Sequence, residues 1–142
     1  MDIMTYKFYI DRRSIIVYAQ IKGVKETRNV KFILDTGASR TVIDNSTAIN
    51  LGFDLKRLET GNTLIGANGG ISSKSLILPK FSMLGKDLVN FEVCVLDLPP
   101  QITYFVDGLI GMDFLLHFKK ITFDFDEKTI ETSPVSPPAH PR

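Results

Sequence analysis

Short runs of β-branched and aromatic residues recur along the chain, and polar clusters containing Gly, Asn or Asp separate them. Such runs are typical of β-strands, and the clusters are typical of the turns that join strands. We expect strands over residues 6–10, 15–21, 30–34, 41–43, 62–66, 71–76, 88–96, 121–125 and 129–132, and one further arm made of residues 76–78 and 81–84. The pattern therefore predicts an all-β fold.

Helical signals are confined to two short stretches. Residues 44–47 offer several helix N-caps, and residues 47–51 allow a turn or two of helix before Gly52 ends it. A second short helix is expected over residues 114–118. Asp113 stands at its N-terminus, where an acidic side chain is favourable.

A tight hairpin is predicted around Ala67-Asn68-Gly69-Gly70, because Asn-Gly between two strand-like segments is the strongest short-range hairpin signal. A Gly-rich tip with few large side chains can open and close over an extended peptide, and such lids exclude water from a reaction. Asn-Gly hairpins also occur on surfaces that have no gating role. The place of this hairpin between the two motifs described below favours a flap, and both interpretations stay open.

Asp35 is an acid with strongly apolar flanks, at the end of the predicted strand 30–34. A carboxylate beside so much hydrocarbon is costly unless it is hydrogen-bonded or partnered. Asp35 is therefore either satisfied locally or held there for chemistry. Gly37 allows a sharp turn and the close approach of a ligand, and Thr36 supplies a hydroxyl group.

Two motifs carry a resemblance to a known family. Residues 32–43 (FILDTGASRTVI) resemble the active-site strand and loop of aspartic proteases, and the Ala after Gly37 resembles the retroviral branch, the retropepsins. Residues 108–115 (GLIGMDFL) resemble the segment in which two hydrophobic residues and a Gly lead into a short helix beneath the catalytic loop. The resemblance extends from about Tyr6 to about Glu131. It implies a closed-barrel-like acid-protease fold with a flap hairpin and one short C-terminal helix.

The resemblance also implies an activity and an assembly. The chemistry needs two carboxylates on one water molecule, one ionised and one protonated. Because the chain has a single Asp-Thr-Gly, a two-fold homodimer must supply one Asp35 from each subunit. The implied function is an aspartic endopeptidase that hydrolyses an extended peptide or protein substrate between hydrophobic residues. The implied catalytic residues are Asp35, Thr36 and Gly37, and the implied substrate-binding residues are Ala38, Ile65, Gly66, Gly69, Gly70, Ile71, Leu109 and Ile110.

Other functions are weighed against this one. A retropepsin-fold module could dimerise and bind peptides with little or no cleavage, although an intact Asp-Thr-Gly favours the enzyme. A serine hydrolase that uses Ser39 or Ser46 with His117 lacks a Gly-x-Ser-x-Gly motif. A phosphate site at residues 66–70 lacks the Lys-Ser/Thr pair that follows at Walker spacing.

The chain departs from the retroviral pattern in two places. Ser39-Arg40 stands where acids are usual, and Met112-Asp113 stands where an Arg usually follows the Gly. A compensating Arg40–Asp113 pair of opposite polarity could replace the usual contact. These differences point to a cellular, bacterial or archaeal member of the family. Ala38 cannot donate a hydrogen bond to the carboxylate as a Ser would, so we expect an acidic pH optimum that is less extreme than in Ser-bearing relatives.

Composition changes this picture little. Of the 142 residues, 44% are hydrophobic and 23% are charged, which is typical of a globular domain. We assign residues 1–132 to one domain and the Pro-rich residues 133–142 to a disordered tail. The net charge of +1 argues against nucleic-acid binding. No apolar run reaches membrane-spanning length, so the expected compartment is the cytoplasm, unless the chain is cut from a longer, anchored protein.

Neither a cofactor nor a metal ion is expected. Cys94 is the single cysteine, so no intrachain disulfide and no cysteine-based metal site can form, and a buried thiol is the expected state. Asp124, Asp126 and Glu127 lie around a predicted turn, and we interpret them as solvated surface charge rather than as a cation site.

Overall fold

The computed structural model describes residues 3–66 and 69–134 of the chain. Within these residues one eight-stranded sheet has the order β2-β3-β4-β9-β5-β8-β7-β6. Its strands are β2 (Tyr9–Asp11), β3 (Ser14–Lys22), β4 (Thr27–Leu34), β5 (Val42–Asp44), β6 (Glu59–Gly66), β7 (Gly69–Met83), β8 (Lys86–Leu96) and β9 (Gly108–Ile110). The predicted all-β fold is confirmed.

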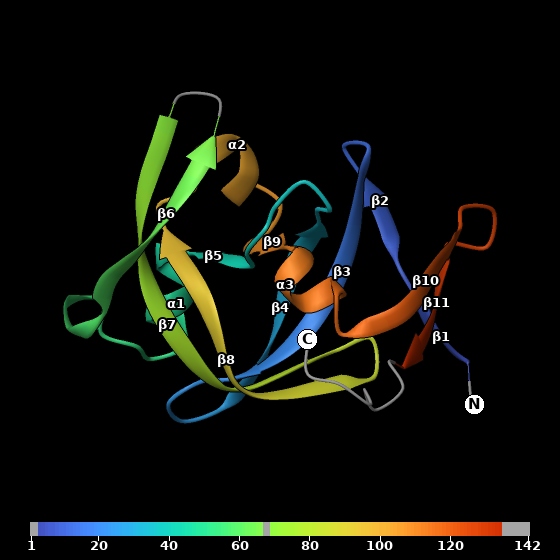
Figure 1. Ribbon diagram of the computed structural model, residues 1–142, viewed down its shortest axis with the longest axis horizontal. Helices are drawn as coiled ribbons and strands as arrows, with labels where there is room; N and C mark the ends of the chain where they lie inside the picture. Colours follow the sequence, from blue (N-terminus) through green and yellow to red (C-terminus); the bar gives the residue numbers. More distant parts are fainter. Residues whose placement is uncertain (1–2, 67–68, 135–142) are drawn as a thin grey trace.

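The large sheet curls until strands from its two halves meet. Additional pairing joins β3 to β7, with Gln20 opposite Ser82 and Lys22 opposite Lys80. The strands from β3 round to β7 therefore form a ring, and β6 and β7 continue from it as a hairpin (Figure 1).

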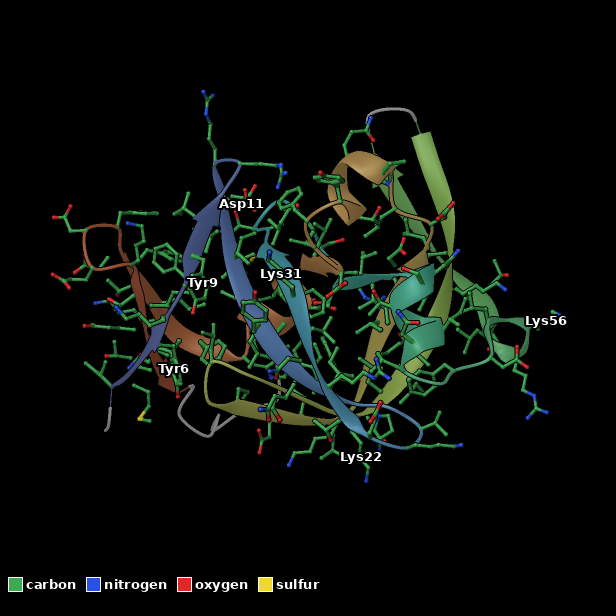
Figure 2. All side chains as sticks on the ribbon, turned by 180° about the vertical axis from the view of Figure 1, so that it is seen from behind. Tyr6, Tyr9, Asp11, Lys22, Lys31 and Lys56 are labelled. Atoms are coloured by element: carbon green, nitrogen blue, oxygen red, sulfur yellow. The ribbon has the colours of Figure 1, made fainter. Side chains whose placement is uncertain are left out.

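A second sheet joins the N-terminal and C-terminal segments of the described chain. It has three strands in the order β1-β11-β10, namely β1 (Met4–Lys7), β11 (Thr129–Pro134) and β10 (Phe118–Asp124). The sequence predicts one strand over residues 6–10, but the structure divides it at Phe8 into β1 and β2. Phe8 is 1% exposed and its N–H donates to Lys128 O at 3.1 Å, so the chain crosses there between the sheets. Figure 2 shows Tyr6 and Tyr9 following one another along this edge.

Two further strand boundaries differ from the prediction. β7 is one strand from Gly69 to Met83, whereas the sequence divides these residues between a hairpin strand over 71–76 and an arm over 76–84. Pro79 of β7 and Asn90 of β8 do not pair in the register of these two strands, and Asn90 has a φ of 55°. The pairing therefore needs no N–H group from the proline. β11 continues to Pro134, and the rest of the predicted tail lies outside the described residues.

The helices are short, and the described residues include α1 (Asn45–Asn50), α2 (Pro100–Thr103), α3 (Met112–Leu115) and the 3-10 turn η1 (Leu55–Arg57). α1 and α3 correspond to predicted helices, and α3 is the C-terminal one that the resemblance implies. α2 is not predicted. Pro100 at its first turn lacks only an N–H that the helix does not use, so this proline can begin the helix. None of the described helices is long and apolar enough to span a membrane.

The hydrophobic core fills the ring and reaches α3. Phe32 of β4, Phe81 of β7 and Phe114 of α3 are all 0% exposed. The ring centroids are 6.0 Å apart for Phe32 and Phe81, and 5.2 Å apart for Phe81 and Phe114. Tilted ring contacts of this kind add to the energy of burial. Phe114 therefore anchors α3 to the strands that carry the Asp35 loop.

Asp44 is the last residue of β5 and the N-cap of α1. Its carboxylate accepts hydrogen bonds from the backbone N–H of Ser46 at 3.0 Å, from that of Leu98 at 2.9 Å, and from the Ser46 hydroxyl group. Burial raises the pKa of Asp44, but the hydrogen bonds from Ser46 and Leu98 outweigh burial and hold this pKa below its ordinary value of 3.8. The fold therefore stabilises the ionised carboxylate.

We expect Asp44→Ala to lower the free energy of unfolding by about 2 kcal/mol, because the helix cap and the Leu98 contact are lost together. A carboxyl group with a lowered folded-state pKa stabilises the fold above its unfolded pKa, and the stabilisation is lost as the pH falls through the folded value. Urea unfolding from about pH 6 down to about pH 2.5 should therefore show a shallower pH dependence for Asp44→Asn than for the native chain. Equal slopes would contradict this assignment.

Candidate active site

Asp35 begins the loop that joins β4 to β5. Its N–H donates to Ile110 O of β9 at 2.9 Å, and its Oδ1 accepts a hydrogen bond from Gly37 N at 2.9 Å. Ala38 N donates to Asp35 O at 3.1 Å, which closes a tight turn around the acid. Two hydrogen bonds therefore fix the backbone of Asp35, and the Gly37 N–H orients its side chain.

β9 lies between β4 and β5 and supports the loop from below. β4 runs parallel to it, with Leu34 opposite Ile110, and β5 runs antiparallel, with Val42 opposite Leu109. A Cβ atom on Gly108 would lie 2.1 Å from Val42 O, so the close approach of β9 to β5 requires glycine at this position. Leu109 is half-buried, but Ile110 is 0% exposed. Of these two predicted substrate-binding residues, Ile110 supports the loop from the core and contributes its carbonyl.

The loop caps the first amides of α3. Met112 N donates to Ala38 O at 2.8 Å, and Asp113 N donates to Ser39 O at 3.1 Å. The first N–H groups of a helix have no partner within the helix, so these carbonyls satisfy them. A Cβ atom on Gly111 would lie 2.6 Å from Arg40 O, so this close approach requires glycine. The contacts explain why α3 begins before the predicted start at residue 114.

Thr41 is a structural member of the site that the sequence prediction missed. It is 0% exposed, and its Oγ1 donates to Asp113 Oδ1 at 2.7 Å and accepts a hydrogen bond from Gly111 N at 3.2 Å. Thr41 N also donates to Asp113 Oδ2 at 2.9 Å. The signal in the sequence was a hydroxyl residue directly before the buried pair Val42-Ile43, and it does not reveal which distant groups the hydroxyl contacts.

Arg40 lies between two acids. Its Nε is 3.7 Å from Asp113 Oδ2, which confirms the predicted Arg40–Asp113 pair. Its Nη2 is 3.0 Å from Glu92 Oε1 on β8, a partner that the sequence prediction did not include. The Ser75 hydroxyl group and Arg40 hold the pKa of Glu92 below its ordinary value. Glu92 therefore faces Arg40 as a carboxylate at neutral pH.

The four residues of the predicted Asp-Thr-Gly-Ala motif differ in exposure. Asp35 and Ala38 are half-buried, whereas Thr36 and Gly37 are exposed on the single chain. The uncharged centre of the loop is thus free to contact another molecule, while the acid beside it is partly shielded.

The predicted flap is an antiparallel hairpin of β6 and β7. Figure 1 shows it rising on the same side of the molecule as the loop between β4 and β5. Its tip, Ala67-Asn68, lies outside the described residues. The described pairs nearest the tip contain the predicted substrate-binding residues of the hairpin: Gly66 with Gly69, Ile65 with Gly70, and Leu64 with Ile71.

The remaining candidate groups have structural roles. Among the described residues, no three or more His, Cys, Asp or Glu side chains gather as they would around a metal ion. Asp124 Oδ1 accepts hydrogen bonds from Asp126 N at 3.1 Å and Glu127 N at 3.0 Å, so this acid caps a turn. The Ser46 hydroxyl group donates to the N-cap carboxylate of α1, and Cys94 is buried in β8 as expected.

A model of the aspartyl protease family matches residues 17–114. The match runs from β3 to α3 and includes the Asp35 loop, the hairpin and β9. The chain belongs to the aspartyl protease family. The match therefore covers every element that holds the candidate site.

Known proteins resemble this member of the aspartyl protease family in fold and sequence. A crystal structure of a retropepsin-like aspartic protease from Rickettsia conorii aligns with a TM-score of 0.68 and 26% identity, over 92% of this chain and 91% of that chain. The retropepsin-like fold is thereby confirmed. EIAV protease complexed with the inhibitor HBY-793 aligns with a TM-score of 0.57 and 20% identity, over 76% of this chain and 90% of that chain, which is a likeness of fold alone.

A curated relative adds a comparison of length. The uncharacterised protein RP867 of Rickettsia prowazekii (strain Madrid E) is 29% identical over 134 residues, which cover 87% of this chain and 54% of the relative. The chain thus spans about half the length of that protein.

We expect Thr41→Val to lower the free energy of unfolding by about 2 to 3 kcal/mol, because the buried Gly111 N–H loses its acceptor and Asp113 loses a donor. Thr41→Ser keeps the hydroxyl group and should recover most of this loss. Urea unfolding at neutral pH measures both variants. If Thr41→Ser were as destabilising as Thr41→Val, retaining the hydroxyl group would not restore stability, and that result would contradict the role given to these hydrogen bonds.

Proposed function

We propose that the protein is an aspartic endopeptidase that acts as a two-fold homodimer. The observation that carries this proposal is the single Asp-Thr-Gly loop, clamped from below by β9 and α3, with Thr36 and Gly37 exposed. The family and the likeness to a retropepsin-like protease of Rickettsia conorii support it. A loop held by so many long-range contacts suits a site whose reacting groups must be positioned before substrate arrives.

The dimer follows from the chemistry. Aspartic-protease hydrolysis uses two carboxylates on one water molecule, and the chain offers one Asp-Thr-Gly. An isologous interface presents the same residue twice, so Asp35 from each subunit meets at the two-fold axis. Thr36 of each chain then hydrogen-bonds across the axis and stiffens the paired loops. Its exposure on the single chain supports this role.

The paired carboxylates divide the work of hydrolysis. Like charges a few ångströms apart cannot both ionise readily, so one carboxyl group stays protonated while the other is ionised. The ionised Asp35 accepts a proton from the water as the water oxygen attacks the peptide carbonyl carbon. The protonated Asp35 donates its proton to the carbonyl oxygen, which gives a tetrahedral diol. The Asp35 that took the proton of the water then passes it to the amide nitrogen as the C–N bond breaks, and the diol returns a proton to the other Asp35 as it becomes the carboxylic acid product.

The substrate binds as an added strand. The backbone of Gly37 and the β6–β7 hairpin supply main-chain hydrogen bonds, and alternate substrate side chains enter apolar pockets. Ala38 and the half-buried Leu109 offer apolar surface near the loop. The preferred substrate is therefore an extended peptide with hydrophobic residues at the cleaved bond.

We expect Asp35→Asn to reduce kcat/KM by about a thousandfold or more, because an amide cannot accept the proton of the attacking water. The test is cleavage of a diverse peptide library from about pH 4 to pH 7, with and without a pepstatin-type inhibitor. Asn can still accept the Gly37 N–H, so unchanged urea unfolding serves as the control for folding. An absence of native cleavage at every pH, at a concentration where the protein is dimeric, would favour a peptide-binding module instead.

Subunit mixing tests the shared site directly. With about a tenfold excess of Asp35→Asn chains, nearly every native chain sits in a mixed dimer, so cleavage per native chain should fall about tenfold. An equal excess of an inert protein is the control. Undiminished cleavage would mean that one chain suffices.

We expect Ala38→Ser to move the pH–rate profile towards lower pH, because an added hydroxyl group can donate to the carboxylates and favour their ionised form. Ser39→Ala, which changes a hydroxyl group one position further along an exposed part of the loop, should leave the profile in place. The measurement is kcat/KM against pH for the three proteins. A native profile that already peaks in the most acidic pepsin range would contradict the role of Ala38.

A further inference from the structure

Arg40 bridges two elements that are far apart in the sequence. Its guanidinium group contacts Glu92 on β8 at 3.0 Å and Asp113 on α3 at 3.7 Å, and its side chain is 27% exposed. A planar guanidinium group can serve two carboxylates in fixed directions, which a lysine cannot do. Arg40 thus ties the end of the Asp35 loop to both elements.

The Glu92 end of this bridge continues to the base of the hairpin. The Ser75 hydroxyl group on β7 donates to Glu92 Oε2 at 2.8 Å. Beside Ser75, the pairing of β7 with β8 begins at Lys74 and Val95. Among the described residues, the part of β7 before Lys74 pairs with β6 alone. Figure 1 shows the two strands continuing together past the end of β8, so Ser75 lies where the hairpin leaves the ring.

The Asp113 end continues to the turn beneath the acid. Asp113 accepts hydrogen bonds from Thr41 N and Thr41 Oγ1, and Thr41 Oγ1 accepts one from Gly111 N. An unbroken series of polar contacts therefore runs from Ser75 through Glu92, Arg40 and Asp113 to the loop and α3. The series joins the two parts of the candidate site that would hold a substrate from opposite sides.

We propose that Arg40 is a positioning residue that sets the orientation of the β6–β7 hairpin relative to the Asp35 loop, and through it the affinity for substrate. Each ion pair alone is weak because it is partly exposed. Their effect comes from the shared guanidinium group, which couples the hairpin base to the loop. The consequence for substrate affinity rests on the proposed function, whereas the orientation of the hairpin does not.

Kinetics test the effect on substrate. Arg40→Met and Ser75→Ala should each raise KM about fivefold and change kcat less than about twofold, because they loosen the hairpin without touching the reacting groups. The KM of the double variant should not exceed that of the more damaging single variant, since both substitutions break the same series of contacts. Ser75→Thr, which keeps the hydroxyl group, should restore the native KM.

The matched control is Arg28→Met, which breaks an exposed Arg28–Glu26 pair of 2.6 Å at the start of β4 and should leave KM unchanged. Additive effects of Arg40→Met and Ser75→Ala, or an unchanged KM in either, would overturn the proposal.

Amide hydrogen exchange on the full chain gives a readout that needs no cleavage. Arg40→Met and Ser75→Ala should each speed exchange in β6 and in β7 up to Lys74, and should leave β3 and β4 at the native rate. Unchanged exchange in the hairpin, or a uniform rise over all strands, would overturn the proposal. If the native protein cleaves no peptide, the proposed function fails, and the exchange result still decides whether Arg40 positions the hairpin.

Discussion

The hydrogen bonds between the Asp35 loop and the first amides of α3 are the contact on which the rest of the site depends. A short helix leaves its first N–H groups without partners, and a tight loop leaves carbonyls without partners. Ala38 O and Ser39 O meet Met112 N and Asp113 N, so each element satisfies the other. These hydrogen bonds require a close approach of the two backbones. Gly111 allows it, since a Cβ atom there would lie 2.6 Å from Arg40 O.

The ring topology turns this local contact into a rigid support. β9 pairs with β4 on one side and β5 on the other, so the strands before and after the loop are tied to the same short strand. Phe114 then fastens α3 to the core through Phe81, whose strand also forms one arm of the hairpin. Movement of the loop, the helix or the hairpin base would disturb packing in a core that tolerates little change in volume.

Local patterns predicted the strand and the turn that carry Asp35, whereas the long-range contacts of the loop were largely beyond them. The strand before Asp35 and the turn after it are encoded in neighbouring residues, and the Arg40–Asp113 pair followed from two substitutions in linked motifs. Glu92 could not be found in this way, because an exposed acid on a strand looks the same whether or not an arginine lies beside it. The break at Phe8 was missed because alternation continues across it while its side chain enters the core.

The exposed side of the loop between β4 and β5 presents few charged groups. Asp35 and Arg40 are the charged residues between β4 and β5, and the guanidinium group of Arg40 is turned towards Glu92 and Asp113. A molecule that approaches Thr36 and Gly37 therefore meets backbone and uncharged side chains, with the side chain of Asp35 next to them. The cation nearest to Asp35 along this loop is thus already paired with acids of the same chain, on β8 and on α3.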